Sequence, residues 1–434
     1  MKAARGFCFT LRSSHAYDTH IGCLEKCTMT STANNVSSID TAVSPVSPEV
    51  RLLQRIASVD ILRGLVMVLM AIDHVRVFSG LPAGGPTPGI FFTRWITHFC
   101  APWFVFLAGT SIFLREDKSR DKAAMARYLV LRGLALVLLE LTVIRISWTF
   151  NFDFAHYLLA GVIWCIGWCM VLMAALIWLP ARIVGAIGVL IILCHNIVDP
   201  FLPHIFQTLE QSHYAWIWQI LYFGGGVKLG ANGPVLAVLY SIIPWIGVMA
   251  AGYWFGQVLK LPAARRDRIC LLLGAVAIAA FLVLRGWNIY GDPRHWGAPG
   301  SKMPPMLAFL ATTKYPASLL FLLMTLGPLF VLTPLAERLR GFVANALTVF
   351  GRVPFFYYLL HIPLIHLAAI IVSLVRTGHV EPWLFANHPM FNPPAPAGYI
   401  WSLGLLYLVW AIVIVVLYFA CSWYLGFSKK RTTA

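Results

Sequence analysis

The chain has 434 residues, of which 59% are hydrophobic and only 12% are charged, and its mean hydropathy is +0.76. A soluble domain of this length carries about twice that share of charged residues, so the composition predicts a protein that crosses a membrane several times. The net charge is +16, but Lys and Arg lie in short clusters between long apolar stretches. This pattern is typical of cytoplasmic membrane loops and argues against nucleic-acid binding.

The first segment of the chain differs from the rest. Residues 1–50 are polar, rich in Ser and Thr, and lack the apolar core of a cleavable signal. We expect a disordered cytoplasmic tail here, with Met29 as an alternative start of translation. A multi-helix membrane domain is expected over 51–427, followed by a basic cytoplasmic tail over 428–434.

The apolar stretches after the tail predict an all-α polytopic integral membrane protein. A helix needs about 20 apolar residues to cross the bilayer, and this length gives about ten expected transmembrane helices. They are 57–78, 94–115, 125–147, 156–179, 181–199, 234–259, 268–288, 315–335, 354–376 and 398–424. An eleventh over 214–230 is an alternative, although the run Gly224–Gly226 and Lys228 argue against it.

Basic residues flank these expected helices in an uneven way. The clusters are Arg51 and Arg55, Arg115–Lys122, Lys260–Arg268, Arg338 with Arg340, and Lys429–Arg431. With ten helices all five clusters fall on one side of the membrane. The positive-inside rule then predicts that both termini are cytoplasmic.

The first expected helix contains "SVDILRGLVMVLMAIDHVR", in which ionisable residues interrupt an apolar stretch. At about 100° per residue, Asp60, Arg63 and His74 share a strip of about 60°. Ionisable groups in hydrocarbon are costly and usually face a cavity or a partner. Two interpretations stay open for Asp60 and Arg63, a snorkelling pair at the interface and a functional site. For His74 they are a carbonyl-bonded core histidine and a proton-transfer group.

Two further residues of the outer half are interpreted from their spacing. Asp73 and Arg76 are three residues apart and are expected to pair, so Asp73 supports the structure rather than orienting His74. The next helix runs antiparallel and brings His98 to the depth of His74. Two His without a carboxylate or Cys ligand make a poor metal site, so we expect no metal.

A second group lies in "FGRVPFFYYLLHIPLIH" near the C-terminus. Arg352 is expected at the level of Arg63, with His361 about 10 Å deeper. The two guanidinium groups are either positive-inside anchors or a binding site for phosphates. Glu140, Arg145 and Arg285 also lie within expected helices and are candidates for pairs inside the bundle. 

The stretch "DILRG" followed by His74, together with "FGRVPFFYYLLH", resembles the transmembrane acyltransferase superfamily. Within it, "RIASVDILRGLVMVLMAIDHVR", "THFCAPWFVFLAGTSIFL", "PWIGVMAAGYWFG" and "KYPASLLFLLMTLGPLF" are similar to the bacterial relatives of heparan-alpha-glucosaminide N-acetyltransferase. The resemblance covers about 57–424. It implies a helix bundle that passes an acyl group, usually acetyl from cytoplasmic acetyl-CoA, to a sugar or glycan hydroxyl or amine on the far side of the membrane.

The resemblance also implies site residues. The superfamily's essential His and Arg correspond to His74 and Arg63. Arg63, Arg352 and His361 are then expected to bind the acyl-CoA, and Asp60 and Asp73 to support the site. The lysosomal branch has an acyl-accepting His in the loop after the first helix, but 79–93 contains none here. This departure favours direct transfer with His74 as the base, and His98 or a nearby Trp or Tyr as oxyanion donor.

The expected activity is therefore that of an acyl-CoA-dependent O- or N-acyltransferase in a bacterial inner membrane. Its partners are membrane lipids and the sugar or glycan acceptor, with a homodimer as an open alternative. A proton-coupled transporter or a lipid-binding membrane protein is the alternative function, because buried Asp, Arg and His also form proton and substrate paths.

Overall fold

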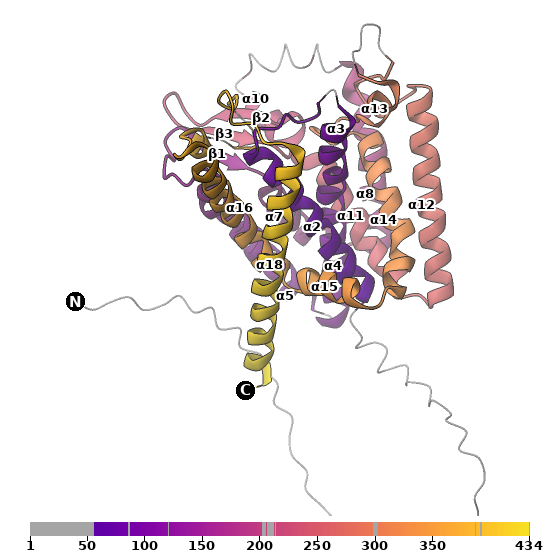
Figure 1. Ribbon diagram of the computed structural model, residues 1–434. Coiled ribbons are helices and arrows are strands. Elements are labelled where there is room, and N and C mark those ends of the chain that lie inside the picture. Colours follow the sequence, from indigo (N-terminus) through magenta and orange to yellow (C-terminus); the bar gives the residue numbers. More distant parts are fainter. Residues whose placement is uncertain are drawn as a thin grey trace, which may run out of the picture. The chain divides into compact units, whose positions relative to one another are not determined.

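The structure is a computed structural model that describes residues 56–433, with gaps at 86, 120, 202–204, 206–211, 213, 298–302, 387 and 391–392. Arg55–Ala434 form one compact unit, which is mainly helical (Figure 1). The tail expected over 1–50 lies outside the described residues and stays a prediction. The C-terminal helix α18 (Leu403–Thr433) includes most of the segment that we expected as a basic tail.

Seven helices in the described part of the chain are long and apolar enough to cross a membrane. This agrees with an all-α polytopic membrane protein. The seven are Pro88–Asp117, Ala181–Phe201, Ile242–Leu259, Ala263–Gly286, Leu319–Arg338, Pro354–Thr377 and Leu403–Ser428. They contain, in this order, α3 (Pro88–Trp95) with η1 (Ile96–Phe99) and α4 (Cys100–Ser119), α8 (Ala181–Cys194) with η3 (His195–Phe201), α11 (Ile242–Leu259), α12 (Ala263–Gly286), α14 (Leu319–Arg338), α16 (Pro354–Thr377) and α18.

The other three expected transmembrane helices have different forms. The first is α2 (Ala57–Phe78), a 22-residue helix with the predicted bounds but with several ionisable residues. The expected helix over 125–147 consists of α5 (Lys122–Leu139), the π-helical turn η2 (Glu140–Ile144) and α6 (Arg145–Thr149). The expected helix over 156–179 is α7 (Val162–Leu176), which is only 15 residues long. The number ten and the cytoplasmic termini stay predictions.

Short strands replace helix in two places. β1 (Tyr157–Ala160) precedes α7, and β3 (Val235–Val238) precedes α11, so the expected helices began too early at 156 and 234. β3 lies between β1, which is parallel to it, and β2 (Gly225–Lys228), which is antiparallel. The eleventh helix over 214–230 is wrong, because this segment forms α10 (Ala215–Trp218), η4 (Gln219–Phe223) and β2. Three successive glycines favour chain reversal over helix.

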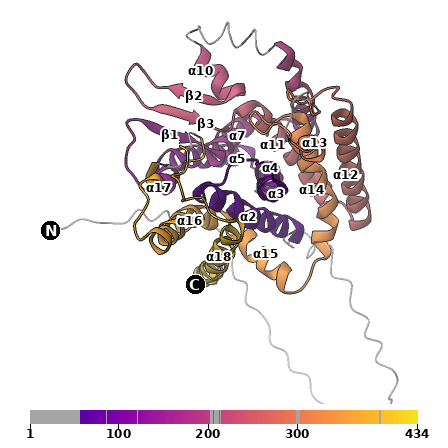
Figure 2. The same cartoon turned by 45° about the horizontal axis from the view of Figure 1, so that its top comes forward.

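Helix α2 packs among α4, α14, α15 (Phe342–Arg352), α16 and α18 (Figure 2). Side chains of three neighbours donate to three successive backbone carbonyls of α2. The Cys100 thiol donates to Val66 O at 3.3 Å, the Tyr357 hydroxyl to Met67 O at 2.8 Å, and the Trp410 indole to Val68 O at 3.0 Å. These bonds fix the height and the rotation of α2 in the bundle.

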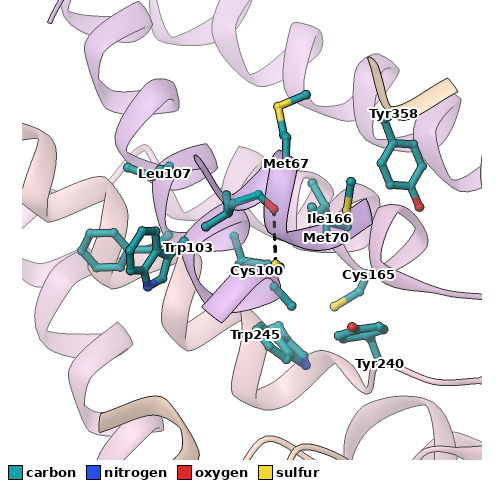
Figure 3. Close-up of a cluster of buried hydrophobic side chains, with 14 of the residues drawn as sticks. Met67, Met70, Cys100, Trp103, Leu107, Cys165, Ile166, Tyr240, Trp245 and Tyr358 are labelled. Atoms are coloured by element: carbon teal, nitrogen blue, oxygen red, sulfur yellow. Dashed lines mark hydrogen bonds between the residues drawn. The ribbon is translucent and has the colours of Figure 1, made fainter. Parts of the chain in front are cut away.

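The middle of α2 lies in the apolar core. Figure 3 shows Met67 and Met70 of α2 beside Cys100 of α4, with Tyr358 of α16 nearby. Met67 is fully buried and Met70 is 5% exposed. Flexible thioethers fill irregular space between helices well. The core thus separates two groups of polar residues, one toward each end of α2.

Two glycines allow α15 to lie directly against the first turns of α2. A Cβ at Gly351 would lie 1.8 Å from Asp60 O, and a Cβ at Gly64 would lie 2.0 Å from Leu347 O. Real side chains do not approach a backbone so closely, so only glycine permits this contact. Pro354 then begins α16 at its first position, where a missing N–H costs nothing. This arrangement brings Arg352 and His361 to α2.

Candidate functional site

Asp60, Arg63 and Arg352 form a cluster near the Ala57 end of α2, which we call the aspartate–arginine cluster. Arg63 donates to Asp60 Oδ1 at 3.5 Å and to Gly351 O at 3.3 Å, and its second amino group donates to Ser111 Oγ at 2.7 Å. Arg352 Nε lies 3.7 Å from Asp60 Oδ2. The two guanidinium groups therefore share one carboxylate, as their predicted common level implied. The Asp60 side chain is 5% exposed, whereas that of Arg352 is 35% exposed.

His74 and His361 form a histidine pair near the other end of α2. His74 Nδ1 lies 2.8 Å from His361 Nε2, and the two rings are stacked with centroids 4.8 Å apart. The rings of Trp148 and His74 meet edge to face, with their centroids 4.9 Å apart. His361 is fully buried, and its Nδ1 lies 2.7 Å from Tyr358 O. The sequence placed His361 with the acyl-CoA site, whereas its hydrogen bond is with the expected base.

Asp73 pairs with Arg76, as its spacing predicted. Arg76 Nε donates to Asp73 Oδ1 at 2.9 Å, and Arg76 Nη1 donates to Leu81 O at 3.1 Å. Asp73 therefore orients the end of α2 rather than the imidazole of His74. The Asp73 side chain is 23% exposed although other helices pack around α2, so solvent-accessible surface reaches this part of the bundle.

His98 lies on η1 and is 8% exposed, with its ring edge against Phe321 at 5.6 Å. Its Nδ1 has no hydrogen-bond partner among the described residues, and no hydrogen bond joins His98 to His74. Both histidines interact electrostatically with Asp73, so they lie in the same part of the bundle. The predicted common depth agrees with this, but the partner of His74 is His361.

Lys314 is a residue that sequence reasoning missed. It lies in the loop between α13 (Pro305–Leu310) and α14, and only 7% of it is exposed. It interacts electrostatically with Asp73, His74 and His98. The sequence signal was weak, because a Lys just before an apolar stretch is usually an exposed interfacial anchor.

The other buried ionisable residues organise local structure. Glu140 accepts from Tyr358 Oη at 3.3 Å and from backbone amides at the start of α7. Arg145 donates to backbone carbonyls of the segment that follows α6, including Tyr157 O at 3.2 Å. Arg285 donates to Phe309 O and Ala308 O, both at 3.0 Å. The expected pairing inside the bundle is therefore wrong for Glu140 and Arg145 within the described part of the chain.

The chemical groups at the two ends of α2 differ. No group of three or more His, Cys, Asp or Glu that could hold a metal occurs in the part of the chain that the structure describes. Imidazole groups can take up and release protons near neutral pH, and guanidinium groups can bind anions, so the histidine pair and the aspartate–arginine cluster offer different chemistry.

Comparison with known proteins identifies the family of the chain. No curated protein matches the chain. The family described as heparan-alpha-glucosaminide N-acetyltransferase, catalytic, matches residues 55–289, which are more than half of the chain. The match includes Asp60, Arg63, His74 and His98, whereas Arg352 and His361 lie beyond it. The chain belongs to the heparan-alpha-glucosaminide N-acetyltransferase catalytic family and is an acetyltransferase-type protein of the membrane.

Proposed function

We propose that the protein transfers an acetyl group from cytoplasmic acetyl-CoA to a hydroxyl or amine of a sugar or glycan on the far side of a bacterial inner membrane. Family membership supports the acetyl transfer. The histidine pair, with His74 Nδ1 2.8 Å from His361 Nε2, is the observation that carries the mechanism.

The aspartate–arginine cluster is the proposed site for the phosphates of acetyl-CoA. Arg63 and His74 are eleven residues apart on one helix, which corresponds to about 16 Å. An extended pantetheine arm spans such a distance. Arg352 has the more exposed guanidinium, so it is the more available of the two for a charge-assisted bond with phosphate.

The hydrogen bonds of the histidine pair support His74 as the base. A backbone carbonyl only accepts, so His361 Nδ1 carries a hydrogen that it donates to Tyr358 O at 2.7 Å. With both rings neutral, His361 Nε2 is then an acceptor, and His74 Nδ1 donates to it. The lone pair of His74 is left on Nε2, which is free to accept a proton from the acceptor.

The proposed step balances without a further reactant. The acceptor oxygen or nitrogen attacks the thioester carbonyl carbon while His74 Nε2 takes its proton. A bond forms between the acceptor and the carbonyl carbon, and the bond from that carbon to sulfur breaks. The CoA thiolate leaves and takes up from His74 the proton that came from the acceptor. No acyl-enzyme intermediate is required.

Labelled acetyl-CoA incubated with the purified full chain in detergent tests this function. We expect binding and slow hydrolysis by the wild type, because water can replace the acceptor. A chain that neither binds nor hydrolyses acetyl-CoA contradicts the proposal and favours the proton-coupled transporter or the lipid-binding protein.

The proposed direction of transfer depends on the orientation of the chain. With both termini cytoplasmic, the aspartate–arginine cluster lies toward the cytoplasm and the histidine pair toward the far side. A reporter that is active only outside the cytoplasm, fused after Ala434, is expected to stay inactive. An active reporter would contradict both the orientation and the cytoplasmic source of acetyl-CoA.

A further inference from the structure

Lys314 is a buried cation without a matching anion. It is 7% exposed and makes no hydrogen bond or ion pair with any residue that the structure describes. Its ammonium group has only a cation–π contact, 5.2 Å from the centre of the neighbouring Tyr315 ring. A buried charge is costly unless it is paired and hydrogen-bonded. The position therefore indicates a ligand that supplies the missing negative charge.

Two neighbouring groups also lack partners. The guanidinium group of Arg94, in the last turn of α3, makes no hydrogen bond or ion pair with the residues described, and the buried Nδ1 of His98 has no hydrogen-bond partner among them. Arg94 and His98 are four residues apart on a continuous helical path, so their side chains lie on one face. Both interact electrostatically with Asp73, and His98 interacts with Lys314. We call Arg94, His98 and Lys314 the cationic subsite.

The local charges do not balance. Asp73 is the carboxylate that interacts with these groups, and its hydrogen bond is already with Arg76. Three cations (Arg76, Arg94 and Lys314) against one anion leave a net charge of +2 with His98 neutral. At a site that is largely buried this excess attracts an anion more strongly than at a fully exposed surface.

The loop that carries Lys314 is held in place from both sides. Asp292 is 7% exposed and accepts from Thr313 N and Thr313 Oγ1, both at 2.8 Å, and from Ser318 Oγ at 2.9 Å. Arg285 also donates to Ala311 O at 3.1 Å. These bonds fix the backbone on each side of Lys314, so the loop holds this residue at one position in the bundle.

We propose that Arg94, His98 and Lys314 bind an anionic group, a carboxylate or a phosphate, that is part of the acceptor. This assignment to the acceptor rests on the proposed function, in which the CoA phosphates lie at the other end of α2. Lys314 interacts electrostatically with His74, so an acceptor held at the subsite lies in the same part of the bundle as the proposed base. The cationic subsite would then favour acceptors with a negatively charged group over neutral sugars.

The test compares three sugars of matched shape in the absence of acetyl-CoA. Thermal unfolding of the detergent-purified full chain is measured with galactose, galacturonate and galactose 6-phosphate. A ligand of the folded state raises the melting temperature with its concentration. We expect one or both anionic sugars to raise it and galactose not to, and the more effective anion identifies the preferred group.

Lys314→Gln is expected to lower the apparent affinity for the effective anionic sugar about tenfold or more, since a charge-assisted bond is lost. Lys228→Gln is the matched control, because Lys228 is an exposed lysine on β2. Arg94→Gln, at a partly exposed position, is also expected to lower the apparent affinity for the anionic sugar. It replaces Lys314→Gln in the test if that variant does not fold. Equal shifts in the wild type and these variants, or no anion-dependent shift in the wild type, overturn the subsite.

Acetyl-CoA binding to the same samples separates this proposal from the proposed function. We expect Lys314→Gln to bind acetyl-CoA as the wild type does. A loss of acetyl-CoA binding in Lys314→Gln, together with normal binding in Arg352→Ala, would assign the subsite to the donor and overturn its assignment to the acceptor. Failure of the wild type to bind acetyl-CoA contradicts the proposed function but leaves the anion response to be read independently.

Discussion

Buried ionisable side chains lie around both ends of α2, but the protein supplies hydrogen-bond and ion-pair partners for them to different extents. At the Ala57 end, Asp60 accepts from Arg63 and forms an ion pair with Arg352, while Ser111 and Gly351 O take further bonds of Arg63. Toward the Phe78 end, Lys314 has no paired anion among the described residues. The chain itself supplies most of the partners of the first group, whereas Lys314 requires an anion that the described residues do not provide.

This difference separates structural from functional charge. A residue whose bonds are all made within the protein has a role in folding that does not require a ligand. Three protein groups already bind the Arg63 guanidinium, so this residue has a structural role besides the proposed contact with phosphate. Unsatisfied buried groups are stronger indicators of a binding or reacting site. The comparison therefore directs attention to the His74 end for the chemistry.

The largest expected effect is that of His74→Gln. Glutamine keeps a hydrogen-bonding side chain of similar reach but does not take up the proton of the acceptor. We expect transfer to fall by about 10²-fold or more, the usual contribution of a general base, with acetyl-CoA binding retained. Single-turnover assays with labelled acetyl-CoA measure both. Persistent transfer in this variant, or an acetylated His98 found in the wild type by mass spectrometry, would mean that another group does the chemistry.

The next largest effect is expected from substitution of His361. It tests whether this residue accepts the hydrogen bond of His74 or binds acetyl-CoA. Leucine at this position removes the acceptor of the His74 Nδ1 hydrogen, so the tautomer with a free Nε2 is no longer favoured. We expect His361→Leu to lower kcat at least about tenfold with an unchanged Kd for acetyl-CoA.

The matched variant is His361→Gln, whose amide oxygen reaches the position of Nε2 and restores part of kcat. If His361 instead binds the donor, as the sequence suggested, the Kd for acetyl-CoA rises in both His361→Leu and His361→Gln, and the two variants have similar kcat values.

Substitutions of the two arginines in the aspartate–arginine cluster are expected to differ in their effects on acetyl-CoA binding and on the melting temperature. Arg352→Ala should weaken acetyl-CoA binding about tenfold, because one charge-assisted bond to phosphate is worth about 1.5–3 kcal/mol. Arg63→Ala should also lower the melting temperature, since it leaves Ser111 and Gly351 O without their donor. Titration of labelled acetyl-CoA and thermal unfolding measure the two effects. Unchanged Kd values in folded variants would make both residues interfacial anchors.

The smallest effect is expected from the N-terminal segment. Deletion of residues 1–28, so that translation begins at Met29, should change neither the melting temperature nor the transfer rate. The segment is polar and contains no stretch that could form an apolar core or span a membrane. A deleted chain that no longer folds would show that the segment packs against the membrane domain.

Properties that repeat along the chain could be predicted from the sequence. Apolar stretches of about 20 residues gave the bounds of α2 and α16 almost to the residue, because hydrophobic length is a local property. The i to i+3 spacing gave the Asp73–Arg76 pair for the same reason. Strands β1 and β3 were missed, because four apolar residues next to a helix read equally well as its first turn.

The sequence by itself determined the membrane class, the family resemblance and the expected common face of Asp60, Arg63 and His74. Each depends on a local property, which is the length of an apolar stretch, a short motif or the spacing within one helix. Only the tertiary structure decided which distant residues meet them. His361 reaches His74 over 287 positions because Gly64 and Gly351 let α15 lie against α2 and so place α16. Lys314 is a buried cation in a loop that Asp292 anchors through Thr313 and Ser318. Such contacts depend on helix packing and loop anchoring, which no local pattern encodes.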